Sequence, residues 1–137
     1  MSPKGFHAAG VHAGLRYSKN DLGIILSEVP ANSAAVYTQS HFQAAPLKVT
    51  QESINQAGML QAIIVNSAVA NACTGEKGLQ DAFEMRDHCA KKFQLAEHHV
   101  AVASTGVIGE YLEMDKIRAG IDQLLPSSQK NHAEDFQ

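Results

Sequence analysis

The sequence has no tryptophan, only two cysteines and no concentrated block of basic residues. Cys73 and Cys89 are too far apart for a CxxC motif and too few for a disulfide framework, so we expect reduced thiols. A formal net charge of −3 without a basic patch argues against nucleic acid as a partner. No apolar run approaches the roughly 20 residues of a membrane helix, and residues 1–10 lack a signal peptide's long apolar region. These absences favour a soluble, cytoplasmic protein.

The length of 137 residues and the hydrophobic share of 45% are sufficient for one compact domain. A globular chain of this size hides roughly two thirds of the surface that it exposes when unfolded, so it can build a sizeable core. No internal repeat or low-complexity tract divides the chain. We therefore expect residues 1–137 to form a single domain.

Short apolar runs and helical stripes alternate along the chain. Residues 1–17 are rich in Gly, Ala and His and predict an irregular arm or a short strand. Apolar runs predict strands at residues 21–29, 34–38, 46–50, 61–67 and 99–104, of which 61–67 is the central one. Helical spacing predicts helices at 77–93 and 114–124, and one or two turns at 52–57 that Gly58 ends. The class is therefore α/β, a mixed sheet with helices packed on it.

Two of these strands run into small polar residues before a helix begins, at 66–78 and at 104–109. Ligands in α/β proteins often bind at such strand ends, where free N–H groups gather. Gly106 would let another molecule approach its backbone N–H, and the Thr105 hydroxyl is a second donor beside it. Two donors aimed at one point could form an oxyanion hole. The alternative is an ordinary turn or a helix N-cap, and the residues alone do not separate the two.

Other residues that often carry chemistry favour structural interpretations. No HxxxH or HExxH pattern joins the histidines, so we expect no metal site; they are His7, His12, His41, His88, His98, His99 and His132. Cys73 lies between a predicted strand and a predicted helix, yet free cysteine is usually a small buried hydrophobe. The segment from Thr74 to Gly78 lacks the spacing of a phosphate-binding loop, and Thr74 is a plausible N-cap.

Five segments resemble one enzyme family, in order and at compatible separations. They are PKGFHAAGVHAGLR, DLGIILSEVPANSAAVYT, AAPLKVT, VNSAVANACTGEKGLQDA and VASTGVIGEYLEMDKIRAGI. Together they span nearly the whole chain and resemble the ornithine acetyltransferase family, also called glutamate N-acetyltransferase. NACTGEKG and ASTGVIG are the most distinctive strings.

The resemblance implies a self-cleaving precursor whose α and β fragments stay associated, with a layered αββα arrangement once both are present. The threonine at the new N-terminus of the β fragment would be the nucleophile, and αβ heterodimers would assemble into a heterotetramer. The enzyme would move an acetyl group from N-acetylornithine to glutamate in cyclic arginine biosynthesis, and some members also use acetyl-CoA as donor. Thr105 and Gly106 match the family's oxyanion hole. No cofactor is implied, and the location would be the cytoplasm, or the mitochondrial matrix in a fungus.

Two features depart from the family pattern. Where the family usually reads Asn-Ser-Gly-Asn-Ala-Asn-Ala-Cys, residues 66–73 carry Ala68 and Val69 in place of the glycine and the first following amide. A Cβ at Ala68 would strain any positive φ there. None of the four threonines has the context of the family's cleavage segment, so the nucleophile is expected on another fragment and the isolated chain is expected to be inactive. Unpaired strands or an uncovered apolar face are expected on this front part of an α fragment. The alternative is a noncatalytic scaffold fragment or a diverged, inactive relative.

Overall fold

The fold is seen in a computed structural model that describes residues 3–128 and 134–136. The elements are β1 (Phe6–Val11), β2 (Leu22–Asn32), α1 (Ala45–Ala57), β3 (Met59–Asn66), α2 (Gly75–Phe93), the 3-10 turn η1 (Glu97–His99), β4 (Val100–Ser104) and α3 (Met114–Gln123). The strands form one sheet in the order β1-β2-β3-β4. β2 runs antiparallel to both β1 and β3, whereas β4 runs parallel to β3. The predicted mixed sheet is confirmed.

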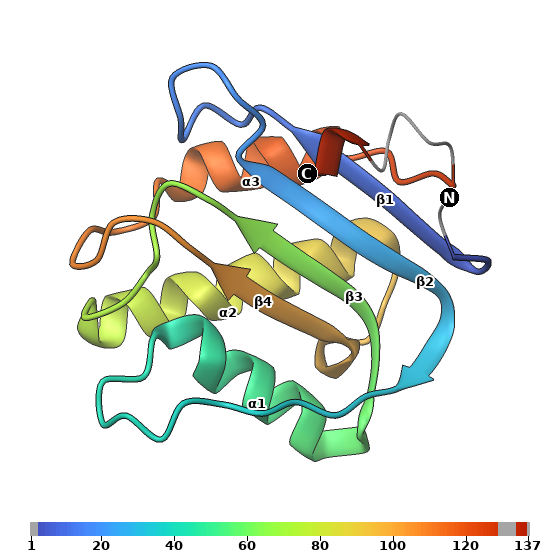
Figure 1. The fold of residues 1–137 in the computed structure, drawn as a ribbon, viewed down its shortest axis with the longest axis horizontal. Coiled ribbons are helices and arrows are strands. Elements are labelled where there is room, and N and C mark those ends of the chain that lie inside the picture. The colour runs from blue at the N-terminus through green and yellow to red at the C-terminus, as the bar shows by residue number, and fades with distance from the viewer. Residues whose placement is uncertain (1–2, 129–133, 137) are drawn as a thin grey trace.

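The helices cover one face of this sheet (Figure 1). A row of apolar side chains crosses that face from β1 to β4, and all are buried: Ala9, Ile24, Ile64 and Val102. Buried residues of α2 and α3, such as Met85 and Ile117, belong to the same core. Along β3, buried side chains alternate with less buried ones, because successive side chains of a strand point to opposite faces of the sheet. The core is therefore a sheet with one apolar helical layer packed against it.

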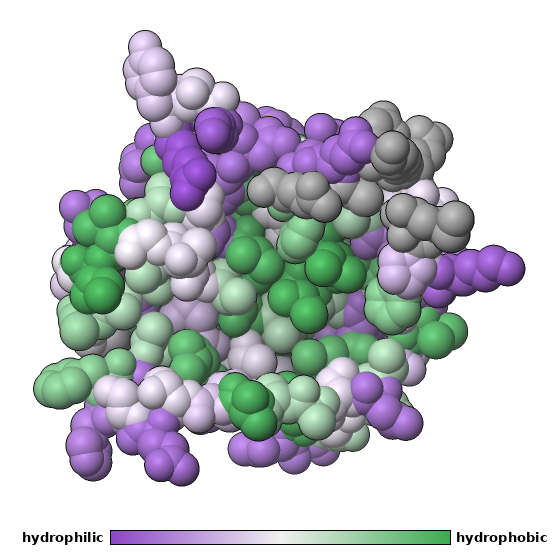
Figure 2. All heavy atoms as spheres, viewed as in Figure 1, coloured by the Kyte–Doolittle hydropathy of each residue, from purple (hydrophilic) through white to green (hydrophobic). Residues whose placement is uncertain are grey.

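The opposite face of the sheet is more open. Ile25 and Ile63 pair across β2 and β3 on this face, and Ile63 is 39% exposed. Phe6 of β1 is 38% exposed, and it lines a small hollow with both isoleucines. Figure 2 shows apolar surface over the middle of the sheet in this view. An uncovered apolar face is what the sequence led us to expect.

Two predicted strands are wrong. Residues 46–50 belong to α1, because Pro46 lies in the first turn, where its missing N–H costs nothing. Val49 is buried and the Thr50 hydroxyl both donates to the Val102 carbonyl at 2.8 Å and accepts the Val102 N–H at 2.9 Å. Thr50 of α1 thereby satisfies both backbone groups of Val102 on the free edge of β4. Residues 34–38, the other predicted strand, have no regular structure.

The remaining elements agree with the sequence to within a few residues. β3 is an inner strand between β2 and β4, α2 is the longest helix, and Gly58 ends α1 in a left-handed conformation with φ 63°. The N-terminal arm contains a true strand, β1. Among the described helices, none is long and apolar enough to cross a membrane.

Candidate functional site

Two loops leave the same end of the sheet, because β3 and β4 are parallel and their carboxyl ends lie side by side (Figure 1). We call residues 67–74 after β3 the first loop and residues 105–113 after β4 the second loop. Four backbone hydrogen bonds join them or anchor them to β3: Thr105 N to Asn66 O at 3.0 Å, Val107 N to Ala68 O at 2.8 Å, Ala70 N to Val107 O at 2.9 Å and Gly109 N to Ala72 O at 2.9 Å. The two loops therefore form one unit.

Gly106 lies where the two loops are closest. Its φ is 132°, and a Cβ built on it would lie 2.1 Å from the Ala68 carbonyl oxygen. No other residue fits this position without moving backbone, since such a contact is far inside van der Waals range. Gly109 also has a positive φ, 86°, a conformation that glycine adopts without strain.

The first loop has a left-handed backbone at three residues that are not glycine: Ala68 (φ 83°), Asn71 (φ 50°) and Cys73 (φ 58°). A left-handed conformation costs a residue with a Cβ roughly 1–2 kcal/mol. Ala68 therefore keeps a backbone shape that suits glycine, at a cost in strain. The departure from the family pattern at this position changes the side chain while the backbone remains in the region that glycine prefers.

Buried amides hold both ends of the first loop. Asn66 is fully buried; its Nδ2 donates to the Val69 carbonyl at 2.9 Å and its Oδ1 accepts the Ser104 hydroxyl at 2.5 Å. Asn71 is also fully buried, and it accepts the Thr74 hydroxyl at 2.7 Å. Our sequence analysis missed both amides and gave Ser104 no chemical role. An asparagine at the end of a wholly apolar strand is the signal that could have found Asn66.

Thr105 and Gly106 are adjacent, exposed and at the start of the second loop. Within the described residues, neither the Thr105 hydroxyl nor the Gly106 N–H has a hydrogen-bond partner, whereas the Thr105 N–H is bonded to Asn66. The alternative in which Thr105 caps a helix is wrong, because α3 begins only at Met114 and Glu113 is its N-cap. The pair is free to donate to a third group.

The structure also places Thr74, Cys73 and Cys89, which the sequence analysis considered for other roles. Thr74 occupies the N-cap of α2, but its hydroxyl bonds to Asn71 instead of capping the helix. Cys73 is exposed, so the prediction of a buried thiol is wrong for it. Cys89 is fully buried in the core, and that burial raises the pKa of its thiol to about 12.

Three of the described histidines contact a carboxylate or a carbonyl: His7, His12 and His88. His7 contacts Glu28 at 2.8 Å, and His88 contacts Asp122 at 2.9 Å. In the part of the chain that the structure describes, no three His, Cys, Asp or Glu side chains are grouped to hold a metal ion. His132 lies outside the described residues.

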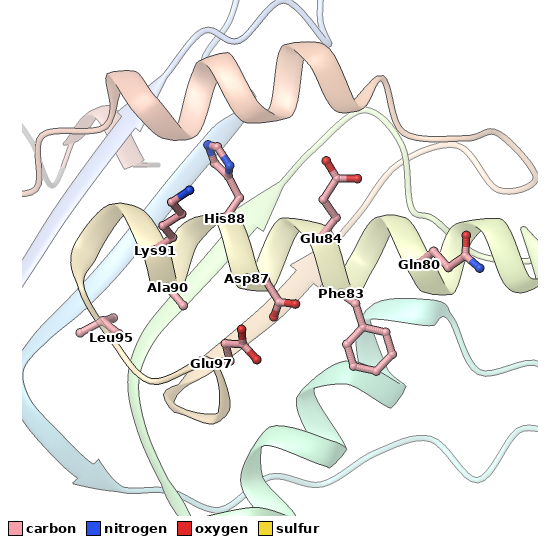
Figure 3. Close-up of a pocket in the computed structure, with 9 residues that line it drawn as sticks. All are labelled: Gln80, Phe83, Glu84, Asp87, His88, Ala90, Lys91, Leu95 and Glu97. Atoms are coloured by element: carbon pink, nitrogen blue, oxygen red, sulfur yellow. The ribbon is translucent and has the colours of Figure 1, made fainter.

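Two surface hollows lie away from Thr105 and Gly106. The larger, of about 690 Å³, follows α2 from Gln80 to Glu97 and contains no residue of either loop (Figure 3). Figure 3 shows Glu84 and His88 pointing toward α3, where they pair with Arg118 and Asp122. The smaller, of about 360 Å³, lies beside the start of α2 and is lined by Cys73, Thr74 and eight further residues. Neither hollow contains Thr105 or Gly106.

Comparison with known proteins agrees with this fold. A profile of the ArgJ family matches residues 7–136. The arginine biosynthesis bifunctional protein ArgJ of Geobacillus kaustophilus is 73% identical over 137 residues, which are 100% of this chain and 33% of that protein. The Bacillus subtilis protein of the same name is 66% identical over 123 residues, 90% of this chain and 30% of that protein. The chain thus spans about a third of the length of these relatives.

Two crystal structures share the fold. The bifunctional protein ArgJ from Bacillus halodurans matches with a TM-score of 0.95 and 59% identity, over 97% of this chain and 70% of that one. Ornithine acetyltransferase from Mycobacterium tuberculosis, in complex with ornithine, matches with a TM-score of 0.92 and 35% identity, over 98% of this chain and 74% of that one. With a family profile that covers residues 7–136, this chain belongs to the ArgJ family.

Proposed function

We propose that this chain is part of an acetyltransferase that moves an acetyl group from N-acetylornithine to glutamate, and that Thr105 and Gly106 form its oxyanion hole. The observation that carries the proposal is the unpartnered pair of donors: within the described residues, the Thr105 hydroxyl and the Gly106 N–H are exposed and make no hydrogen bond. Membership of the ArgJ family and the likeness to ornithine acetyltransferase supply the reaction class.

The reaction needs a nucleophile from outside this chain. A threonine at the N-terminus of a companion fragment attacks the acetyl carbonyl, and the carbonyl oxygen becomes an oxyanion. Collapse of this tetrahedral intermediate breaks the bond to the ornithine nitrogen, which leaves as an amine after it gains a proton. The acetyl group is then an ester on the threonine, and the amine of glutamate attacks it through a second oxyanion. N-acetylglutamate leaves and the threonine hydroxyl is restored.

Thr105 and Gly106 act on both oxyanions in the same way. Their hydrogen bonds strengthen as negative charge develops on the oxygen, so they favour the tetrahedral state over the planar substrate. Loss of one such donor typically costs about 3 kcal/mol of activation free energy, or roughly a hundredfold in rate. Gly106 suits this task because the Ala68 carbonyl on one side fixes its backbone.

The open face of the sheet supports a companion fragment. Ile63 and Phe6 are more than a third exposed there, and a second apolar layer would remove them from water. This is the layered αββα arrangement that the family resemblance implies. Assembly of αβ heterodimers into a heterotetramer, the absence of a cofactor, the use of acetyl-CoA as a donor and a cytoplasmic location stay predictions.

Reconstitution tests the proposal. We call the full-length enzyme that contains this chain, with the rest of its α fragment and the β fragment that supplies the threonine, the complete enzyme. Residues 1–137 purified alone should transfer no acetyl group from N-acetylornithine to glutamate, and the complete enzyme should do so. Mass spectrometry should find a companion polypeptide that begins with threonine. Turnover by residues 1–137 alone would show that the nucleophile lies within this chain. An inactive complete enzyme would favour the alternative of a different reaction or of a noncatalytic scaffold.

A further inference from the structure

Asn66 is a buried polar side chain that connects the two loops of the site. It ends β3, is fully buried and faces Ser104, its partner in the parallel ladder of β3 and β4. We propose that Asn66 and Ser104 are positioning residues, which set the direction of the Thr105 and Gly106 donors without touching substrate. The inference rests on the proposed oxyanion hole.

The hydrogen bonds of Asn66 lead to both loops. Its Nδ2 donates to the carbonyls of Ser67 at 3.2 Å and Val69 at 2.9 Å, on either side of Ala68. Its Oδ1 accepts the Ser104 hydroxyl at 2.5 Å, and its backbone carbonyl accepts the Thr105 N–H at 3.0 Å. Every polar atom of the amide therefore has a partner, as a buried polar group requires.

These bonds fix the orientation of the Asn66 amide. Two carbonyl oxygens need a donor, so the NH₂ group faces Ser67 and Val69 and the oxygen faces Ser104. An aspartate would keep the acceptor for Ser104 but place a carboxylate oxygen against two carbonyl oxygens. The position therefore requires an amide, although aspartate has almost the same shape.

The Ala68 carbonyl connects the hydrogen bonds of Asn66 to the backbone of Gly106. Asn66 holds the carbonyls of both neighbours of Ala68, and the Ala68 oxygen lies against the Cα of Gly106 and accepts the Val107 N–H at 2.8 Å. Rotation of the peptide between Ala68 and Val69 would move that oxygen and release Gly106. On the other side, the Ser104 hydroxyl ties the residue before Thr105 to the same amide.

The test measures kcat, KM and melting temperature of Ser104→Ala in the complete enzyme. Ser33→Ala is the matched control, because Ser33 is also half-buried and its hydroxyl also donates one bond, to Ala31 at 3.0 Å, at the far end of β2. We expect Ser104→Ala to lower kcat about tenfold with KM within about twofold, because a misdirected donor weakens transition-state binding selectively. Ser33→Ala should leave kcat unchanged.

Asn66→Asp is the stronger variant and should lower kcat further. If Asn66→Asp does not fold, the result for Ser104→Ala decides the test. An unchanged kcat for well-folded Ser104→Ala would overturn the inference. A loss of kcat equal to that of Ser33→Ala would also overturn the inference, because it would reflect a general loosening of the fold and not a misdirected donor.

Thr105→Ala distinguishes the possible failures. Ser104→Ala should cost less than tenfold in a Thr105→Ala background, because one of the donors that it positions is already gone. An equal loss in both backgrounds would overturn the inference. If Thr105→Ala lowers kcat and Ser104→Ala does not, only the positioning role fails. If Thr105→Ala leaves kcat unchanged, the oxyanion hole itself is wrong and this inference falls with it.

Discussion

Gly106 and Ala68 are in direct backbone contact: a Cβ on Gly106 would lie 2.1 Å from the Ala68 carbonyl oxygen. The two residues come from loops that are nearly forty positions apart in the sequence, and the hydrogen bond from Val107 N to Ala68 O, at 2.8 Å, holds them together. This contact explains why a glycine stands at position 106. It also makes the first loop a part of the site, although the proposed donors belong to the second.

Gly106→Ala should therefore harm the fold of the site as well as its activity. We expect the complete enzyme to lose about 3 kcal/mol of stability, because the new methyl group meets backbone and the φ of 132° strains it. Thermal unfolding measures the effect. Gly109→Ala is the control, since its φ is 86° but nothing lies within 4 Å of its added Cβ; it should cost only about 1 kcal/mol. Equal losses would contradict the contact.

Ala68→Gly should stabilise the complete enzyme. The φ of 83° strains alanine and suits glycine, so relief of strain should outweigh the larger entropy of an unfolded glycine, with a net gain of about 0.5–1 kcal/mol. Ala72→Gly in the same loop is the control, because its φ is not positive and glycine there can only lose stability. A lower melting temperature for Ala68→Gly would show that the strain is absent.

The sequence predicted the sheet and its helices well where the apolar pattern is long. The helix α2 and the strand β3 each bury one face against the core, so their apolar pattern can be seen in the sequence. The prediction from the sequence failed at residues 46–50, where the β-branched residues Val49 and Thr50 favour a strand by local preference. Packing decided otherwise, because α1 buries Val49 and turns the Thr50 hydroxyl to the edge of β4.

The site was predicted in part. Thr105 and Gly106 follow a strand, and that position can be read from the sequence. The contact of Gly106 with Ala68 and the bonds of Asn66 depend on β4 lying parallel to β3, which no local pattern encodes. The role of the pair in acetyl transfer stays a prediction.

Asp21→Asn should destabilise the N-terminal part of the fold. The buried carboxylate accepts four backbone N–H groups at 2.6–3.1 Å, from Ala13, Gly14, Leu15 and Arg16. An amide would turn an NH₂ group toward at least one of these donors, so we expect a loss of about 2–3 kcal/mol in thermal unfolding. Asp122→Asn, on an exposed carboxylate that pairs with His88, should cost less than about 1 kcal/mol. Similar losses would contradict this account of Asp21.

The two thiols should differ sharply in reactivity. Cys73 is exposed, whereas Cys89 is fully buried and its pKa is raised to about 12, so Cys89 carries almost no thiolate at pH 8. Iodoacetamide should modify Cys73 in the folded enzyme and Cys89 only after denaturation, as mass spectrometry of the peptides can show. Between pH 9.0 and about 12 the folded thiol holds a proton that the unfolded one has lost, so stability should fall as pH rises. Rapid labelling of native Cys89 would contradict its burial.

The most direct test of the oxyanion hole is Thr105→Ala in the complete enzyme, with kcat, KM and melting temperature measured on the same sample. Because the hydroxyl is exposed and unpartnered within the described residues, its loss should leave the melting temperature nearly unchanged. We expect kcat to fall about a hundredfold, with KM altered far less. An unchanged kcat per folded enzyme would show that Thr105 has no part in the chemistry, and the proposed site would be wrong.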